Sequence, residues 1–119
     1  MMNQSLILEY NNEKIAVVRN TYERAVFHYF HGMDWIGFNN WLNSGYLLKQ
    51  TVLYKDCDHF IDFKDWENEL KLLNLHPKDI SVMEGQRHIT DWKQWYTLKS
   101  LQLVNKLYSA ELRRYGYSY

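Results

Sequence analysis

The stretch KIAVVRNTYERAVFHYF, residues 14–30, decides the fold of this chain. It begins with a short apolar run rich in β-branched side chains, which is typical of a buried strand. Asn20 then stands where a helix cap is needed, Glu23 follows three residues later, and Gly32 provides a stop signal. The stretch therefore predicts a strand that leads through Arg19 directly into a helix.

The sequence on both sides of this unit predicts a small sheet among helices. Residues 6–10 form a second β-prone run, and the turn dipeptide Asn11-Asn12 separates it from the strand, so a hairpin is expected. A strand is also expected over residues 59–63. The other expected segments are helices over residues 34–43, 65–73 and 98–115, a surface loop over 78–90, and a segment at 46–55 that fits either a helix or irregular structure.

The last of these helices has the clearest pattern. Thr97 is a suitable cap, apolar residues recur every three to four positions, and Gly116 stands where a helix terminator belongs. The order of elements favours one α/β domain over residues 1–119 that is mostly helical, with a sheet of two or three strands.

Composition narrows the class of protein. The 119 residues include 14 basic and 14 acidic side chains, and this balance argues against proteins that overall charge draws to nucleic acid or to anionic membranes. Cys57 is the single cysteine, so no disulfide forms within the chain and a reducing compartment is favoured. With no apolar run of membrane-spanning length and no basic start, we expect a soluble, cytoplasmic protein without a signal peptide.

Metal binding is not expected. His28, His31 and Asp34 are close in sequence, and so are Cys57, Asp58 and His59, but this spacing is commonplace and lacks the pattern of a zinc site.

Three segments in order resemble the sulfotransferase family. KIAVVRNTYERAVFHY is similar to its second nucleotide-binding signature, an apolar strand followed by Arg-Asp/Asn-Pro-Tyr-x-Arg, two hydrophobic residues and Ser-x-Tyr. Residues 60–66 resemble the family strand and turn of form Arg-Phe-Glu-x-Leu, and residues 95–119 resemble its final helix and Phe-Gly-Tyr ending. The resemblance spans residues 14–119 and implies a reduced sulfotransferase-like domain, related in fold to nucleotide kinases.

The family transfers a sulfonate from 3′-phosphoadenosine 5′-phosphosulfate to a hydroxyl or amine. By resemblance, Arg19 would hold the nucleotide 3′-phosphate, with Asn20 at the helix mouth, Arg24 one turn along and Arg87 in the loop near the nucleotide. A guanidinium and a helix N-terminus both favour phosphate, although Arg19 could instead pair with Glu23. The implied ligand is adenosine 3′,5′-bisphosphate or 3′-phosphoadenosine 5′-phosphosulfate, bound weakly and without a metal.

The sequence also departs from the family pattern. Phe27 replaces the serine that would hold the phosphate, Thr21 replaces the proline, and Lys64 stands where the family has Glu. About thirteen residues precede the strand and contain no glycine, so we expect this chain to lack the Gly-rich phosphosulfate loop of the family. Loss of even one oxyanion-type donor costs roughly 100-fold in rate, and so no catalytic residue is assigned and no activity is expected of the chain alone.

Three functions remain open from the sequence. The favoured one is a non-catalytic binding or protein-interaction module, a pseudoenzyme that retains weak nucleotide binding. The alternatives are half of a split sulfotransferase completed by a partner chain, and a virion, toxin-related or inhibitor component acting through protein contacts. Absence of the first family strand exposes a sheet edge, which residues 6–10, a second copy or another protein must cover. Phe27, Tyr29 and Phe30 fit core packing better than ligand stacking. Trp92, Trp95 and Tyr96 fit core packing or an exposed patch for a sugar or a protein.

Overall fold

The predicted strand-to-helix unit forms the centre of the fold. The structure is a computed structural model that describes residues 3–32 and 36–119. In it, β2 (Glu13–Val18) is buried over its last four residues and leads into α1 (Thr21–Phe30). The Asn20 side chain caps α1 by accepting a hydrogen bond from the Tyr22 N–H at 2.9 Å, as expected. The Glu23 carboxylate, expected to complete the cap, pairs with Arg19.

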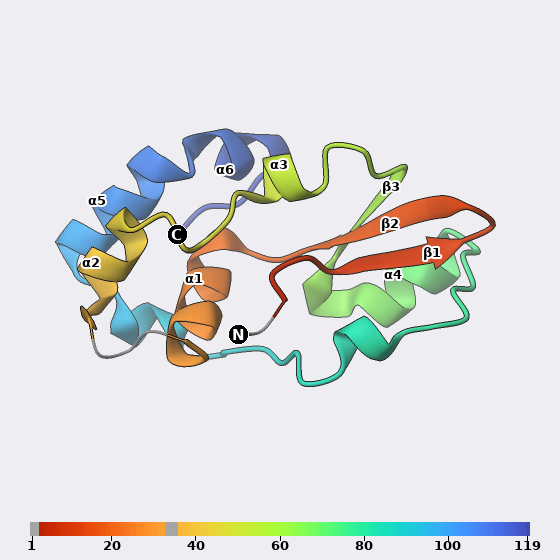
Figure 1. Ribbon diagram of the computed structural model, residues 1–119, viewed down its shortest axis with the longest axis horizontal. Coiled ribbons are helices and arrows are strands. Elements are labelled where there is room, and N and C mark those ends of the chain that lie inside the picture. The colour runs from red at the N-terminus through yellow and green to blue at the C-terminus, as the bar shows by residue number, and fades with distance from the viewer. Residues whose placement is uncertain (1–2, 33–35) are drawn as a thin grey trace.

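The predicted hairpin is confirmed. β1 (Ile7–Tyr10) pairs antiparallel with β2, and β3 (His59–Asp62) pairs parallel with β2 on its other side. Asn11 and Asn12 both have a positive φ, of 52° and 65°, which asparagine tolerates better than other side chains. The strand order is β1-β2-β3, so residues 6–10 cover the edge of β2 that the sequence left exposed (Figure 1).

The described residues form a mixed α/β domain with six α-helices around this three-stranded sheet. The expected helix at 65–73 is confirmed as α4 (Trp66–Leu72), and the undecided segment contains the single turn α3 (Gln50–Leu53). The expected loop at 78–90 contains one 3₁₀ turn, Ser81–Met83. α2 (Phe38–Asn43) begins after Gly37, and the expected start at Asp34 lies outside the described residues.

The prediction of one unbroken final helix is wrong. The segment forms α5 (Leu98–Leu107) and α6 (Ser109–Tyr115), separated at Tyr108, whose φ of −117° and ψ of 23° are not helical. The Tyr108 hydroxyl donates to the Leu47 carbonyl at 2.6 Å, and this buried contact holds the bend against the rest of the fold. Both predicted ends are confirmed, because Thr97 and Ser100 form a capping box and Gly116 has a left-handed φ of 74°.

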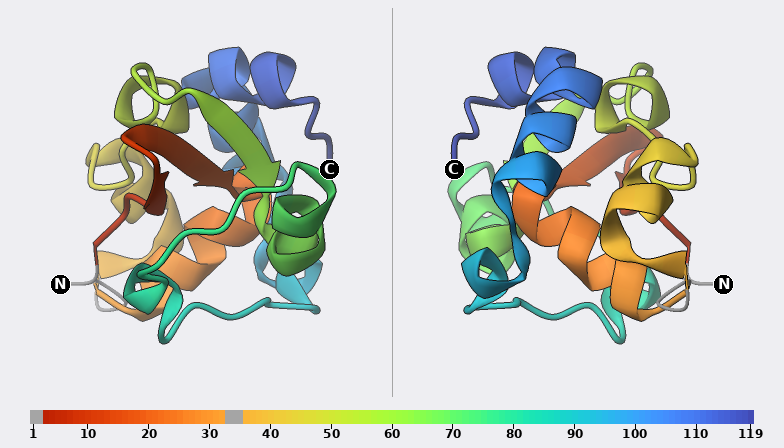
Figure 2. Two further views of the ribbon diagram at one scale, coloured as in Figure 1. Left: turned by 90° about the vertical axis from the view of Figure 1, so that its right-hand side faces the viewer. Right: turned by 90° about the vertical axis from the view of Figure 1, so that its left-hand side faces the viewer.

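Alternate residues of β2 face two layers. Ile15 and Val17 face α4 and the 3₁₀ turn at Ser81–Met83, whereas Ala16 and Val18 pack against Tyr54 after α3 and against the segment after α6. Figure 1 shows these layers below and above the sheet, and the right-hand view of Figure 2 shows α5 beside α1 and α2 at the end of the molecule away from the hairpin turn. No helix in residues 3–32 or 36–119 is long and apolar enough to cross a membrane.

Two apolar clusters divide the interior. A sheet cluster comprises Leu6, Leu8, Ile15, Val17, Ile61, Phe63, Leu70, Leu75 and Met83. A helical cluster comprises Tyr22, Ala25, Tyr29, Trp41, Leu42, Leu47, Val104 and Tyr108. Phe27 and Tyr29 are buried, as expected for core residues, whereas Phe30 is 46% exposed.

A buried polar network, made by Arg19, Thr21, Gln50 and Glu111, ties the centre of the fold together. Glu111 on α6 accepts hydrogen bonds from the Thr21 hydroxyl at 2.6 Å and from the backbone N–H and side chain of Gln50 at 2.8 and 2.7 Å. Gln50 also exchanges two hydrogen bonds with the backbone of Arg19. Because unpaired buried polar groups are costly, these contacts fix α3 and α6 against the start of α1.

Candidate binding pocket at the carboxyl ends of the parallel strands

Arg19, the main candidate from the sequence, is almost fully buried. Its side chain is 1% exposed, and its guanidinium lies between the rings of Phe27 and Phe63, with centroids 4.3 and 4.1 Å away. The Phe27 ring therefore lies against the guanidinium. Such cation–π contacts are worth about 2 kcal/mol when desolvated.

Protein groups occupy the terminal donors of Arg19. Nη2 donates to Glu23 Oε1 at 2.9 Å and to the Arg87 carbonyl at 2.7 Å, and Nη1 donates to Gln86 Oε1 at 3.0 Å. Nε is buried without a hydrogen-bond partner among the described residues. Burial lowers the pKa of Arg19 from its usual value, and the Glu23 carboxylate opposes this shift. The pairing with Glu23 is the structural alternative that the sequence allowed.

The two other arginine candidates lie elsewhere. Arg24 is buried and donates to the Leu48 carbonyl at 2.7 Å, so it supports the segment before α3. Burial lowers the pKa of Arg24, and the charge of Glu111 opposes this shift. The Arg87 backbone carbonyl accepts a hydrogen bond from the Arg19 side chain, and residue 87 itself is exposed. The structure therefore brings Arg19 together with the backbone of Arg87 and places Arg24 in a different contact.

A pocket of about 620 Å³ opens beside the first turn of α1. It lies where the parallel strands β2 and β3 end, which is the usual ligand position in open α/β sheets. Asn20 is the one predicted site residue that lines it. The described residues that line it are Asn20, Glu23, Asp62, Phe63, Lys64, His88, Ile89, Thr90, Trp92, Lys93 and Tyr119.

One wall of the pocket is aromatic. Trp92 stacks on Tyr22 with centroids 5.7 Å apart and planes 10° apart, and it meets the edge of Tyr119 at 5.4 Å. Tyr96 completes this cluster, and its hydroxyl donates to the Tyr22 carbonyl at 2.7 Å. Burial, followed by neighbouring tyrosines, raises the pKa of Tyr96, so its hydroxyl stays protonated. The wall is thus a fixed group of rings that offers Trp92 and Tyr119 to the pocket.

The charges in the pocket favour an anionic group. Lys64 and Lys93 line it, and the Lys93 ammonium lies 4.9 Å from the Tyr119 ring centroid. The acidic lining residues are already engaged, because Glu23 pairs with Arg19 and Asp62 accepts from the Lys64 N–H and the Tyr117 hydroxyl. An anion near the two lysines would therefore meet carboxylates that protein donors have partly neutralised.

Glu23 also fixes the loop that borders the pocket. Its Oε2 accepts from the Ile89 N–H at 3.3 Å and lies 3.7 Å from His88 Nδ1. The His88 ring packs on Phe63 with centroids 4.5 Å apart. Arg19 and Glu23 together hold residues 86–89 in place. Arg19 therefore supports the pocket wall without lining the pocket itself.

The sequence did not identify the two lysines or Tyr119 as site residues. The sequence gives Lys64 no binding role, and Lys93 belongs to no motif. A weak signal for Lys93 was its position inside the aromatic segment Trp92–Tyr96. Tyr119 reaches the pocket through the tertiary fold, which no local pattern reveals.

Within the described residues, no three His, Cys, Asp or Glu side chains are grouped so that they could hold a metal ion. Asp34, one of the weighed metal candidates, lies outside those residues. Comparisons of the chain with protein-family models, curated proteins and solved structures found no match.

Proposed function

We propose that this chain is a non-catalytic, sulfotransferase-like binding module that holds a nucleotide of the adenosine 3′,5′-bisphosphate class in the pocket beside α1. The observation that carries the proposal is the combination of an aromatic wall, Trp92 and Tyr119, with two lysines, Lys64 and Lys93, around one pocket. The volume of this pocket, about 620 Å³, falls within the range of small-molecule binding sites.

The pocket offers separate partners for the two parts of such a ligand. An adenine ring would stack on the exposed part of the aromatic wall, which is worth about 1–3 kcal/mol per base. A phosphate would pair with Lys64 and Lys93 near the Asn20-capped start of α1, where the helix dipole adds attraction. Arg19 would act indirectly, because its hydrogen bonds to Glu23, Gln86 and Arg87 hold the pocket wall.

The arrangement of the sheet favours a module over half of a split enzyme. β1 pairs with β2 over four residue pairs, from Ile7 with Ala16 to Tyr10 with Glu13. A companion chain that supplied a parallel strand at this edge would have to displace the hairpin. Binding without sulfonate transfer is therefore the better-supported role.

The proposal places the protein in the cytoplasm. Cys57 is half-buried and is the single cysteine of the chain, and burial raises the pKa of its thiol. A protonated, partly shielded thiol without a disulfide partner in the chain suits a reducing compartment.

Titration calorimetry with adenosine 3′,5′-bisphosphate tests the function. We expect measurable binding by the natural protein, and an affinity at least about tenfold lower for the double variant Lys64→Ala/Lys93→Ala, because two charge-assisted contacts are lost. The matched control is Lys71→Ala, an exposed lysine on α4 that does not line the pocket. The absence of heat and of amide chemical-shift changes at millimolar nucleotide would refute the proposal, and so would equal affinities for all three proteins.

A further inference from the structure

An apolar groove lies where α2, the segment before α3 and the α5–α6 bend meet. Its volume is about 340 Å³, and it shares no lining residue with the pocket beside α1. Val52 and Leu48 in its wall remain 62% and 48% exposed. The main apolar lining residues are Leu42, Leu47, Leu48, Val52, Leu107 and Tyr108.

The neighbouring helices carry an uncompensated positive charge. Residues 92–119 contain five of the 14 basic side chains of the protein and one of its 14 acidic side chains. That acidic residue is Glu111, which is 1% exposed and bonded inside the fold. The charged groups that α5 and α6 present to solvent are therefore basic: Lys99, Lys106, Arg113 and Arg114.

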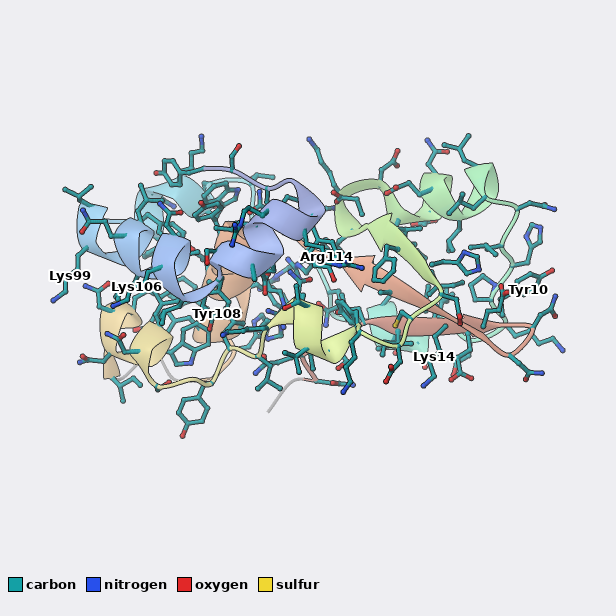
Figure 3. The ribbon with its side chains drawn as sticks, turned by 90° about the horizontal axis from the view of Figure 1, so that it is seen from above. Tyr10, Lys14, Lys99, Lys106, Tyr108 and Arg114 are labelled. Carbon is teal, nitrogen blue, oxygen red and sulfur yellow. The ribbon has the colours of Figure 1, made fainter. Side chains whose placement is uncertain are left out.

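One of these lysines, Lys106, is next in sequence to the groove wall, and Lys99 lies on the same helix face. Lys99 and Lys106 are seven residues apart on α5 and so share one face of the helix, separated by about 10 Å along its axis. Figure 3 shows both on the side of α5 that faces α2. Lys106 directly precedes Leu107 of the groove wall, and Lys49 is the one charged residue among the described lining residues.

We propose that this surface binds an acidic amphipathic helical segment of a protein partner. Apolar side chains of the segment fill the groove, and its carboxylates pair with Lys49, Lys99 and Lys106. Acidic residues seven apart on a helix running alongside α5 would match the spacing of Lys99 and Lys106. The groove thus has the two features of helix-in-groove recognition, an apolar cleft and a complementary charged border.

The concave shape distinguishes this occupant from an anionic membrane. A membrane-binding surface inserts protruding apolar side chains into the bilayer interface, whereas the side chains here line a hollow. The hollow suits side chains that project from a partner helix.

A synthetic peptide of Glu and Leu, about 15 residues long with Leu at helical spacing, is the probe. Fluorescence anisotropy of the labelled peptide should show binding that weakens as salt rises, because the charge contacts are exposed. We expect the affinity for the peptide to fall by at least about tenfold for Lys99→Glu/Lys106→Glu and for Val52→Asp. Lys71→Glu on α4 is the matched control and should bind like the natural protein. Far-UV circular dichroism confirms that each variant is folded.

A matched peptide with Lys in place of Glu, and vesicles of phosphatidylserine and phosphatidylcholine, test the alternatives. Equal binding of the basic peptide, tighter binding of the vesicles, or affinities that the groove variants leave unchanged would overturn the proposal. No detectable binding of the acidic peptide at millimolar concentration would do the same. Nucleotide binding should be unaffected by the groove variants, so the two proposals can fail separately.

Discussion

At the scale of single residues, Arg19 shows how an arginine at the exit of a strand can be part of the interior. Two phenyl rings cover the faces of its guanidinium, and Glu23, Gln86 and the Arg87 carbonyl take its terminal donors. A ligand anion would have to displace these groups to reach it. The ion pair with Glu23 is therefore expected to contribute mainly to the stability of the pocket wall.

The contribution of the Arg19–Glu23 ion pair to stability can be measured by replacing first Arg19 alone and then both residues. Arg19→Met should lower the free energy of unfolding by about 3–5 kcal/mol, because Glu23 is left as a buried, uncompensated charge. Adding Glu23→Gln should recover part of that loss, since the stranded charge is gone. Urea unfolding of the two variants checks the prediction, which fails if the double variant is no more stable than the single one.

His28 makes the protein sensitive to acid. Burial, followed by the charges of Arg24, Arg19 and His31, lowers the pKa of His28 to about 3. In the unfolded chain a histidine takes up its proton near pH 6.5, so the unfolded state binds more protons between these values and stability falls as pH decreases. Between pH 7 and pH 5 the natural protein should lose about 1–2 kcal/mol more than His28→Gln. Urea unfolding at both pH values tests this, and equal losses would contradict it.

At the scale of elements, the sequence predicted the hairpin turn and the helix ends, because residues close to them in sequence determine these features. The Asn11-Asn12 turn, the Asn20 and Thr97 caps and the Gly116 terminator all act within a few residues of their own position. The break at Tyr108 escaped prediction because the apolar spacing continues through it. Its contact with the Leu47 carbonyl spans 61 residues, and a helical pattern carries no information at that range.

The hairpin turn offers a direct test at this scale. Asn12 has a φ of 65°, which glycine adopts without strain and a β-branched residue adopts at a cost of about 1–2 kcal/mol. Asn12→Gly should therefore raise the free energy of unfolding by up to about 1 kcal/mol, and Asn12→Val should lower it. Thermal and urea unfolding measure both changes. A more stable valine variant would show that the turn has another conformation.

At the scale of the whole molecule, two apolar clusters share one buried polar network. The chain extends over 42 × 26 × 24 Å, with the sheet cluster toward one end and the helical cluster toward the other (Figure 1). Glu111 joins α6 to α3 and to the start of α1 through three hydrogen bonds. The two ends should therefore unfold together while this network is intact.

The substitution Glu111→Ala should uncouple the unfolding of the sheet end of the molecule from that of the helical end. The variant leaves Thr21 and Gln50 without their acceptor, so we expect a loss of about 3 kcal/mol or more, mainly at the helical end. Hydrogen exchange would then show α1 and α5 opening before β2 and β3. Equal exchange changes in both regions would argue against the network as the link between them.

The binding pocket shows how far the sequence could lead at this scale. Of the four residues that the motif proposed, Asn20 lines the pocket, whereas Arg19, Arg24 and Arg87 do not. Lys64, Lys93 and Tyr119 come from three other segments, and only the packing of α1 against the turn at Trp92–Trp95 and the chain end brings them together. Local patterns predict such elements, whereas their meeting depends on contacts between residues far apart in the sequence.

Glu111 follows in sequence both of the elements that it joins, and this sets an order for folding during synthesis. The ribosome releases the hairpin, α1 and α3 long before α6. Until α6 emerges, the Thr21 hydroxyl and Gln50 lack the acceptor on which they later depend. A nascent chain can thus form its local hairpin early, but its helical end must wait until α6 has been synthesised before it acquires native packing.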